Sequence, residues 1–313
     1  MADAKVTALS EVSVPALEDL TYWVDDPAGT PTSAKASMTR VMGLFGLLPG
    51  GRLTLESGVP VSTSDQNTKT TLYYTPHLHD KIRIYDGTRW RVYTFAELSL
   101  ALGTLTTSIP YDVFVYDNSG TLTLELTAWT SISARATALA KQDGVYVKSG
   151  AVTRLYLGTI YMTTATTCDD AVAARGVWNM YNKVALKHSL VCAGVSNSYN
   201  TDAYREWAGV TNRIGVLCGL AETRIVTGTY RFIQATGGGN KTMTMSIGLN
   251  AAGADYCTVA QTIAVSTADT GGSATECVAF AEGYSVLYAT ERNWSAGGSP
   301  TFFGMSVEVE NFS

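Results

Sequence analysis

Hydrophobic and polar residues alternate in short runs along most of this chain. The clearest case is "KIRIYDGTRWRVY", in which Ile82, Ile84, Trp90 and Val92 alternate with polar or charged residues. The Asp-Gly pair between the two runs suits a tight turn, because glycine adopts positive φ without steric cost. The segment therefore predicts a β-hairpin with one buried and one exposed face.

The same alternation divides the chain into four segments and predicts a mainly β fold. Residues 1–48 hold a strand-like "DLTYWVDD", a Pro/Gly turn and a helix-like "KASMTRVMGLFGLL", which together suit an attachment segment with little core of its own. Residues 49–167 consist of short alternating runs cut by Gly, Asn-Ser-Gly and Asp-Gly turns, a pattern typical of an antiparallel sandwich or barrel. Residues 189–313 return to short strands rich in Thr, Val, Ile and aromatics, and predict a second β-sandwich of the jelly-roll kind.

The segment between them, residues 168–188, is expected to be a helical connector. Its sequence "CDDAVAARGVWNMYNKVALK" places acids near the start and lysines near the end, the order that a helix dipole favours. Trp178 and Tyr181 are three residues apart and would share one face of that helix. This face is a candidate contact between chains, and local core is the alternative for both residues.

Composition narrows the classes of partner. The chain has 313 residues, only 16 % of them charged, and a formal net charge of -5, so a grip on nucleic-acid phosphates is not expected. The amino terminus has acids where a secretory signal needs a basic start, and no apolar run approaches the ~18 residues of a membrane span, so no membrane insertion is expected. The five widely spaced cysteines predict buried, reduced thiols: Cys168, Cys192, Cys218, Cys257 and Cys277.

One long stretch resembles a known module. The runs "GGRLTLESGVPVS", "KIRIYDGTRWRVY", "YDVFVYDNSGTLTLELTAWT", "DGVYVKSGAVTRLYLGTIY" and "VWNMYNKV", within residues 50–184, are similar to a β-rich module of tailed-bacteriophage structural proteins such as tail fibres and head fibres. The resemblance implies a modular homotrimer in the virion, assembled in the host cytoplasm. Its amino end would be held by a portal, neck, tail or capsid protein, and its carboxy end would face outward toward a host-surface glycan or protein.

The two ends of the chain carry weaker resemblances. "VTALSEVSVPALEDLTYWVDD" is similar to amino-terminal attachment segments of such proteins, and "AFAEGYSVLYATERN" and "GGSPTFFGMSVEV" are similar to the closing strands of jelly-roll tip domains. Aromatic and apolar residues supply the candidate anchors to the virion: Tyr22, Trp23, Val24, Met42, Leu44 and Phe45. Aromatics in the polar segment "SNSYNTDAYREWAGV" are candidates for receptor contact: Tyr199, Tyr204 and Trp207. Local packing is the alternative for every one of these residues.

No pattern of catalytic, metal or cofactor chemistry stands out. His77, His79 and Asp80 are too few to favour a metal site over an exposed loop, and His188 stands alone. "ATGGGNK" lacks the spacing of a phosphate-binding loop. No spacing selects an acid pair from the last-segment carboxylates Asp202, Glu206, Glu276, Glu282 and Glu291. The prediction is a non-enzymatic virion protein without cofactor; a capsid or neck decoration protein and a host-polysaccharide depolymerase are the alternatives.

Overall fold

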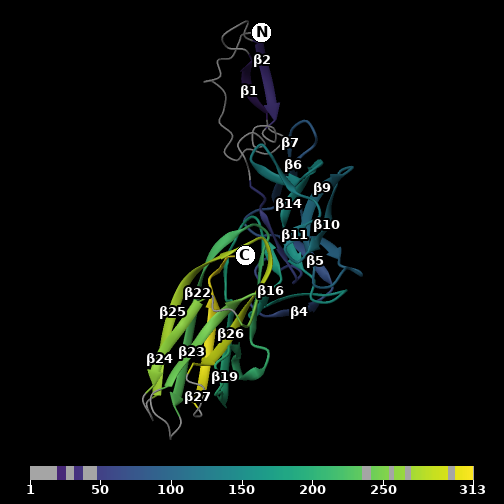
Figure 1. Cartoon of the computed structure of the whole chain (residues 1–313). Coiled ribbons are helices and arrows are strands. Elements are labelled where there is room, and N and C mark those ends of the chain that lie inside the picture. Colours follow the sequence, from purple (N-terminus) through teal and green to yellow (C-terminus); the bar gives the residue numbers. More distant parts are fainter. Residues whose placement is uncertain are drawn as a thin grey trace.

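The computed structural model describes residues 20–25, 32–37, 48–234, 241–253, 257–264, 269–294 and 300–312. Within these ranges the chain is mainly β, as predicted, and its one helical element is the 3-10 turn η2 (Trp207–Gly209). Figure 1 shows a group of central sheets followed by a longer carboxy-terminal unit. No helix in the described part of the chain is long and apolar enough to cross a membrane.

The amino-terminal segment contributes one antiparallel strand pair, β1 (Leu20–Asp25) with β2 (Thr32–Ser37). Tyr22, Trp23 and Val24 lie in β1, and the register sets Trp23 opposite Ala34. The first residues of the expected helix, 35–37, belong to β2 instead. Met42, Leu44 and Phe45 lie outside the described residues, so anchoring by any of the six candidates stays a prediction.

The central part of the chain forms three sheets around one apolar core. Its strands are β3 (Gly51–Thr54), β5 (Thr71–Pro76), β6 (Lys81–Tyr85), β7 (Trp90–Thr94), β8 (Leu98–Ala101), β9 (Pro110–Asn118), β10 (Thr121–Ser131), β11 (Ala134–Arg135), β12 (Leu139–Gln142), β13 (Val145–Lys148), β14 (Ala151–Tyr161) and β17 (Val177–Asn179). The sheet orders are β11-β10-β9-β14-β13-β12 with β17 also on β14, β3-β5-β8, and β6-β7. Leu72, Ile82, Val113 and Leu155 bring all three sheets into the same core.

The hairpin expected from the sequence is confirmed as β6 and β7. Tyr85 pairs with Trp90 across the turn, and Gly87 has a φ of 99°, which a side chain would strain. Ile82 and Ile84 lie in the core, whereas Val92 pairs with Arg83 and is buried on the opposite face, so the prediction of one buried face shared by these residues is wrong. Trp90 departs from the prediction: its ring lies half-buried under the Arg83 guanidinium, 4.6 Å from the ring centroid, outside the core cluster.

The carboxy-terminal unit consists of two sheets that share a second apolar core. Its strands are β19 (Ser189–Ser198), β20 (Arg205–Glu206), β21 (Arg213–Cys218), β22 (Glu222–Gln234), β23 (Lys241–Leu249), β24 (Cys257–Ala264), β25 (Asp269–Phe280), β26 (Gly283–Asn293) and β27 (Pro300–Val309). One sheet has the order β19-β27-β22-β25, and the other runs β24-β23-β26-β21 with β20 also on β26. Val226 and Met305 from the first sheet pack in one cluster with Ile214 and Ile247 from the second.

The predicted helical connector is wrong, because residues 168–188 form short strands. These are β15 (Cys168–Ala171), β16 (Ala174–Arg175), β17 and β18 (Ala185–Leu186). Distant strands stabilise each of them: β15 pairs with β4 (Gln66–Lys69), β16 pairs in parallel with β21, and β18 pairs with β28 (Asn311–Phe312). The connector thereby extends the β21 sheet back to the central part of the chain.

A third core cluster joins the central sheets to the carboxy-terminal unit. Trp178 is 1 % exposed and packs with Phe114, Tyr156 and Leu217. Its indole Nε1 donates a hydrogen bond to Glu222 at 3.1 Å. This burial corrects the expected contact between chains at Trp178, since its contact surface is already used within one chain. Tyr181 is half-buried, and a role between chains stays a prediction for it.

Charged groups complete this junction. The buried Arg135 guanidinium donates to Asp112 at 2.7 Å, and it also bonds Glu282 and the carbonyl of Gly219. Tyr161 and Tyr284 stack with ring centroids 3.7 Å apart and pack against the Trp178 cluster. Because these contacts pair residues from both sides of the junction, the two parts of the chain form one packed body.

Candidate functional site

The end of the carboxy-terminal unit farthest from the central sheets carries the expected receptor-contact segment. Strand β26 begins beside the central part, where Tyr284 N–H donates to the Ile132 carbonyl, and runs away from it to Asn293 (Figure 1). The segment from Tyr199 to Trp207 lies at that far end, because β20 pairs with residues 290 and 291 near the end of β26. Side chains from two stretches that are ~90 residues apart in sequence thus meet at one tip.

Four of them form a surface group that we call the tip cluster: Asp202, Tyr204, Arg292 and Trp294. The Arg292 guanidinium lies 3.4 Å from the Trp294 ring centroid and 5.0 Å from that of Tyr204. Its Nε donates to Asp202 Oδ1 at 2.8 Å. Trp294 is 40 % exposed, and its indole Nε1 donates to Thr244 Oγ1 at 2.6 Å. The Arg292 guanidinium and the Trp294 indole are therefore held in place by other protein groups without a ligand.

A buried ion pair supports the tip cluster from inside. Glu291 is fully buried, and Arg205 Nε donates to its Oε1 at 2.7 Å while Asn197 donates to its Oε2 at 3.1 Å. Burial raises the pKa of the Glu291 carboxyl, and the Arg205 charge opposes that shift. Arg205 also covers the Tyr199 ring at 3.9 Å. Removing either partner would leave an unpaired charge in the interior.

The three predicted receptor residues have different surroundings. Tyr204 belongs to the tip cluster, and Tyr199 lies half-buried under Arg205. Trp207 is 2 % exposed and meets the Phe302 ring edge-on at 5.9 Å, so receptor contact by Trp207 is corrected to a core role. Trp294 was not identified from the sequence. This residue follows a strand directly, and no local sequence pattern indicates which side chains it contacts.

Most of the other candidate catalytic or metal-binding side chains form ion pairs or hydrogen bonds within the protein. Among the last-segment carboxylates, Asp202 pairs with Arg292, Glu206 with Arg213, Glu282 with Arg135 and Glu291 with Arg205. His79 Nδ1 accepts a hydrogen bond from the Lys81 N–H at 3.2 Å. Within the described part of the chain, no group of three or more His, Cys, Asp or Glu side chains is arranged to hold a metal ion. Cys168, Cys192 and Cys218 are buried free thiols as predicted, whereas Cys277 is exposed.

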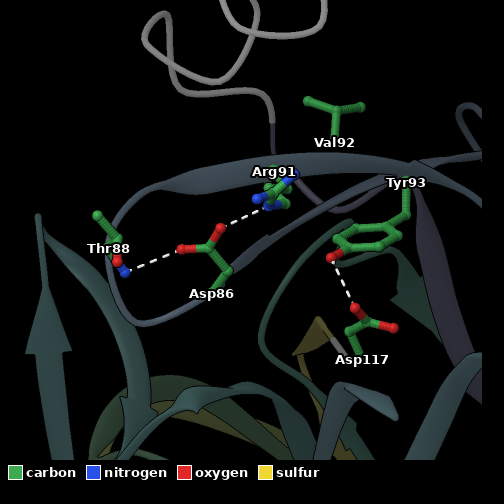
Figure 2. Close-up of a pocket in the computed structure, with 6 residues that line it drawn as sticks. All are labelled: Asp86, Thr88, Arg91, Val92, Tyr93 and Asp117. Carbon is green, nitrogen blue, oxygen red and sulfur yellow. Dashed lines mark hydrogen bonds and ion pairs between the residues drawn. The ribbon is translucent and has the colours of Figure 1, made fainter. Parts of the chain in front are cut away.

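A concave surface lies on the hairpin of the central part. The groove has a volume of about 610 Å³ and is lined by Asp86, Thr88, Arg91, Val92, Tyr93 and Asp117. Figure 2 shows Asp86, Arg91, Tyr93 and Asp117 around one open space, with the Val92 side chain on the other side of its strand. We call this feature the hairpin groove.

Hydrogen bonds fix the polar walls of the hairpin groove. Asp86 Oδ1 accepts from the Thr88 N–H at 2.9 Å, and its Oδ2 accepts from Arg91 Nε at 2.5 Å. The Arg91 hydrogen bond and those from the turn lower the pKa of the Asp86 carboxyl to about 2. Tyr93 O–H donates to Asp117 Oδ2 at 3.0 Å, and partial burial next to this carboxylate raises the pKa of Tyr93 to about 12. At neutral pH the Asp86 carboxyl is therefore ionised and the Tyr93 phenol is neutral.

Comparisons with known proteins give no family for this chain. No protein-family model and no curated protein matches it. Among solved structures, a family 35 carbohydrate-binding module from Clostridium thermocellum matches with a TM-score of 0.21 and 12 % identity, over 40 % of this chain and 97 % of that chain.

Two glycoside-acting enzymes match at a similar level. An isomalto-dextranase from Arthrobacter globiformis T6 matches at a TM-score of 0.19 and 15 % identity, over 76 % of this chain and 36 % of that chain. An exo-β-1,3-galactanase from Phanerochaete chrysosporium matches at 0.20 and 11 % identity, over 91 % and 74 %. Scores this low do not establish a shared fold, and the activities of these proteins are not assigned to this chain.

Proposed function

We propose that this protein is a structural component of a tailed-bacteriophage virion, a homotrimeric fibre or appendage that meets the host surface through its carboxy-terminal unit. The amino-terminal segment would hold it to the particle. The resemblance of residues 50–184 to a β-rich phage module supports the virion role. The tip cluster, at the end of the carboxy-terminal unit that points away from the central module, is the observation that carries the recognition role.

Strand order supports a jelly roll for the carboxy-terminal unit. Lettered B to I in chain order without β20, its eight main strands give the sheets B-I-D-G and C-H-E-F, the arrangement of a jelly roll made from two Greek keys. All neighbours in both sheets are antiparallel, as that fold requires. Jelly rolls occur in viral capsid and lectin domains, where loops at one end are available for ligands.

The chemistry of the tip cluster suits a glycan. The Trp294 indole is 40 % exposed and offers apolar contact to a sugar ring, and the paired guanidinium and carboxylate beside it donate and accept hydrogen bonds. Because Thr244 and Asp202 already hold these groups, a ligand loses less free energy in ordering them. A host-surface polysaccharide is therefore the proposed ligand class.

Binding of the fluorescently labelled full chain to a panel of bacterial strains tests this function. We expect binding to some strains, and Trp294→Ala should lose at least about tenfold in affinity because the stacking face is gone. Trp90→Ala, which removes the half-exposed indole of the hairpin, is the matched control and should bind as the wild type does.

Two results would contradict the proposal. Absence of binding to every strain, together with binding to virion proteins, would favour a decoration protein. Release of reducing sugar from the bound polysaccharide would show a depolymerase instead.

A further inference from the structure

We propose that the hairpin groove is a second binding site, and that its ligand is a segment of uncharged oligosaccharide. The groove is separate from the tip cluster: it lies on the hairpin β6–β7 and the end of β9 in the central part of the chain. Its volume of about 610 Å³ falls in the range of ~300–1,000 Å³ that is common for small-molecule sites. The proposal does not depend on the virion role.

The strand pattern explains why these side chains meet. In β7, Arg91 and Tyr93 alternate with Val92, and the register sets them opposite Ile84 and Ile82, so both lie on the face of the hairpin that carries these two core residues. The turn before β7 returns Asp86 to the same face, because its carboxylate accepts hydrogen bonds from the N–H groups of Thr88 and Arg89, both at 2.9 Å. The hydrogen bond from Tyr93 O–H to Asp117 joins this face of the hairpin to the end of β9, and residues of both line the groove.

Charge and existing hydrogen bonds exclude the other ligand classes. Asp86 and Asp117 against Arg91 give the lining a formal charge of about -1, which disfavours phosphates and acidic sugars. All four carboxylate oxygens already accept hydrogen bonds, those of Asp117 from Tyr93 and from the Gly120 N–H at 2.7 Å, so a metal ion would have to displace donors. The lining is mostly polar, which disfavours an apolar ligand.

The remaining chemistry matches sugar hydroxyls and sugar rings. A carboxylate oxygen accepts more than one hydrogen bond, so Asp86 and Asp117 retain acceptor capacity for hydroxyl donors. The half-buried Tyr93 ring gives one planar wall against which a pyranose ring packs. Because the polar walls are cross-linked by protein hydrogen bonds, they need little reorganisation on binding.

Saturation-transfer NMR of the full chain with maltotriose, mannotriose and N,N′,N″-triacetylchitotriose, all uncharged, tests the site. We expect transfer to at least one of the three, and Tyr93→Ala should weaken the binding constant about tenfold. Asp117→Asn keeps the side-chain size and should weaken it severalfold, which guards against a fold defect in the alanine variant. Tyr116→Ala removes a neighbouring tyrosine that faces Arg154 outside the groove, and should bind as the wild type does.

Three results would overturn the inference. The first is absence of transfer to all three sugars. The second is transfer that neither Tyr93→Ala nor Asp117→Asn changes. The third is loss of transfer with Trp294→Ala alone, which would place the sugar at the tip cluster. In any of these cases the proposed function would still stand if the Tyr93→Ala variant binds cells.

Discussion

Arg135 shows how single buried charges organise the junction. Its side chain is 7 % exposed and pairs with Asp112, whose side chain is 2 % exposed. Burial raises the pKa of Asp112, although Arg135 opposes the shift. The Trp129 ring covers the guanidinium at 4.3 Å. Such a pair is weak evidence for stability, because desolvation offsets attraction, but the further bonds of Arg135 to Glu282 and to the Gly219 carbonyl link the two parts of the chain.

His188 is the second buried titratable group near the junction. The ring is 2 % exposed, and burial together with the charges of Arg224 and Arg175 lowers its pKa to about 3. A histidine whose pKa is lowered by folding contributes stability that is present above its unfolded pKa of about 6.5, and that is lost as the pH falls toward the folded value. Asp170 acts in the opposite sense, since burial raises its pKa to about 6.

Replacing His188 should therefore change how stability depends on pH. Between pH 7 and pH 5 we expect the wild type to lose about 2 kcal/mol of unfolding free energy relative to His188→Gln, because only the wild type must protonate this imidazole on unfolding. Urea denaturation at both pH values measures the difference, and the Asp170 contribution cancels because both proteins carry it.

His77→Gln is the matched control, because that ring is half-buried. It should retain most of the wild-type pH dependence. Parallel pH profiles for the wild type and His188→Gln would show that His188 is accessible to water.

At the scale of elements, strands predicted from local alternation were the reliable part. The hairpin β6–β7 was predictable because its turn chemistry and its period of two agree within thirteen residues. Residues 168–188 were not, because strands of two to four residues have no local pattern strong enough to outweigh a helix-like charge order. Their stability comes from partners such as β21, about 40 residues away in sequence.

The sites follow the same division. Tyr204 was named from the sequence, because an aromatic residue in a polar loop is conspicuous. Its neighbours Arg292 and Trp294 were not, since the pairing of β20 with β26 joins segments whose register no local signal gives. The hairpin groove was missed for another reason: Asp86, Arg91 and Tyr93 lie within a correctly predicted hairpin, but Asp117, which completes the groove, comes from β9.

The corrected role of Trp178 gives a prediction at this scale. Trp178→Ala should lower the free energy of unfolding by roughly 3–5 kcal/mol, because it removes a large buried side chain and its hydrogen bond to Glu222. The mass in solution should stay that of the wild type, since the contact is within one chain. Denaturant unfolding and light scattering measure the two quantities.

Trp90→Ala is the control for this change, because it removes a half-buried indole from the hairpin and should lower stability less. A smaller assembly with unchanged chain stability would instead restore Trp178 to a contact between chains.

At the scale of the whole molecule, the two ends of the chain differ in how they are packed against the rest. The central sheets and the carboxy-terminal unit are joined by the Trp178 cluster, the Arg135 network and the β16–β21 pairing. The strand pair β1–β2, by contrast, hydrogen-bonds only with itself among the described strands. The proposed anchor is thus the part of the chain whose removal disturbs the described cores least.

Deletion of residues 1–48 tests the division between anchor and assembly. The three core clusters draw all their residues from position 53 onward, so the truncated chain should still fold. It should also form assemblies with the same number of chains as the full-length protein. Under the proposed function, light scattering of the full protein gives three chains of 33.4 kDa each. Phage assembled in cells that supply only the truncated chain should lack it, because attachment is lost while the fold is kept. A truncated chain that still enters particles would move the anchor to the central module, and a monomeric full-length protein would remove the homotrimer from the proposal.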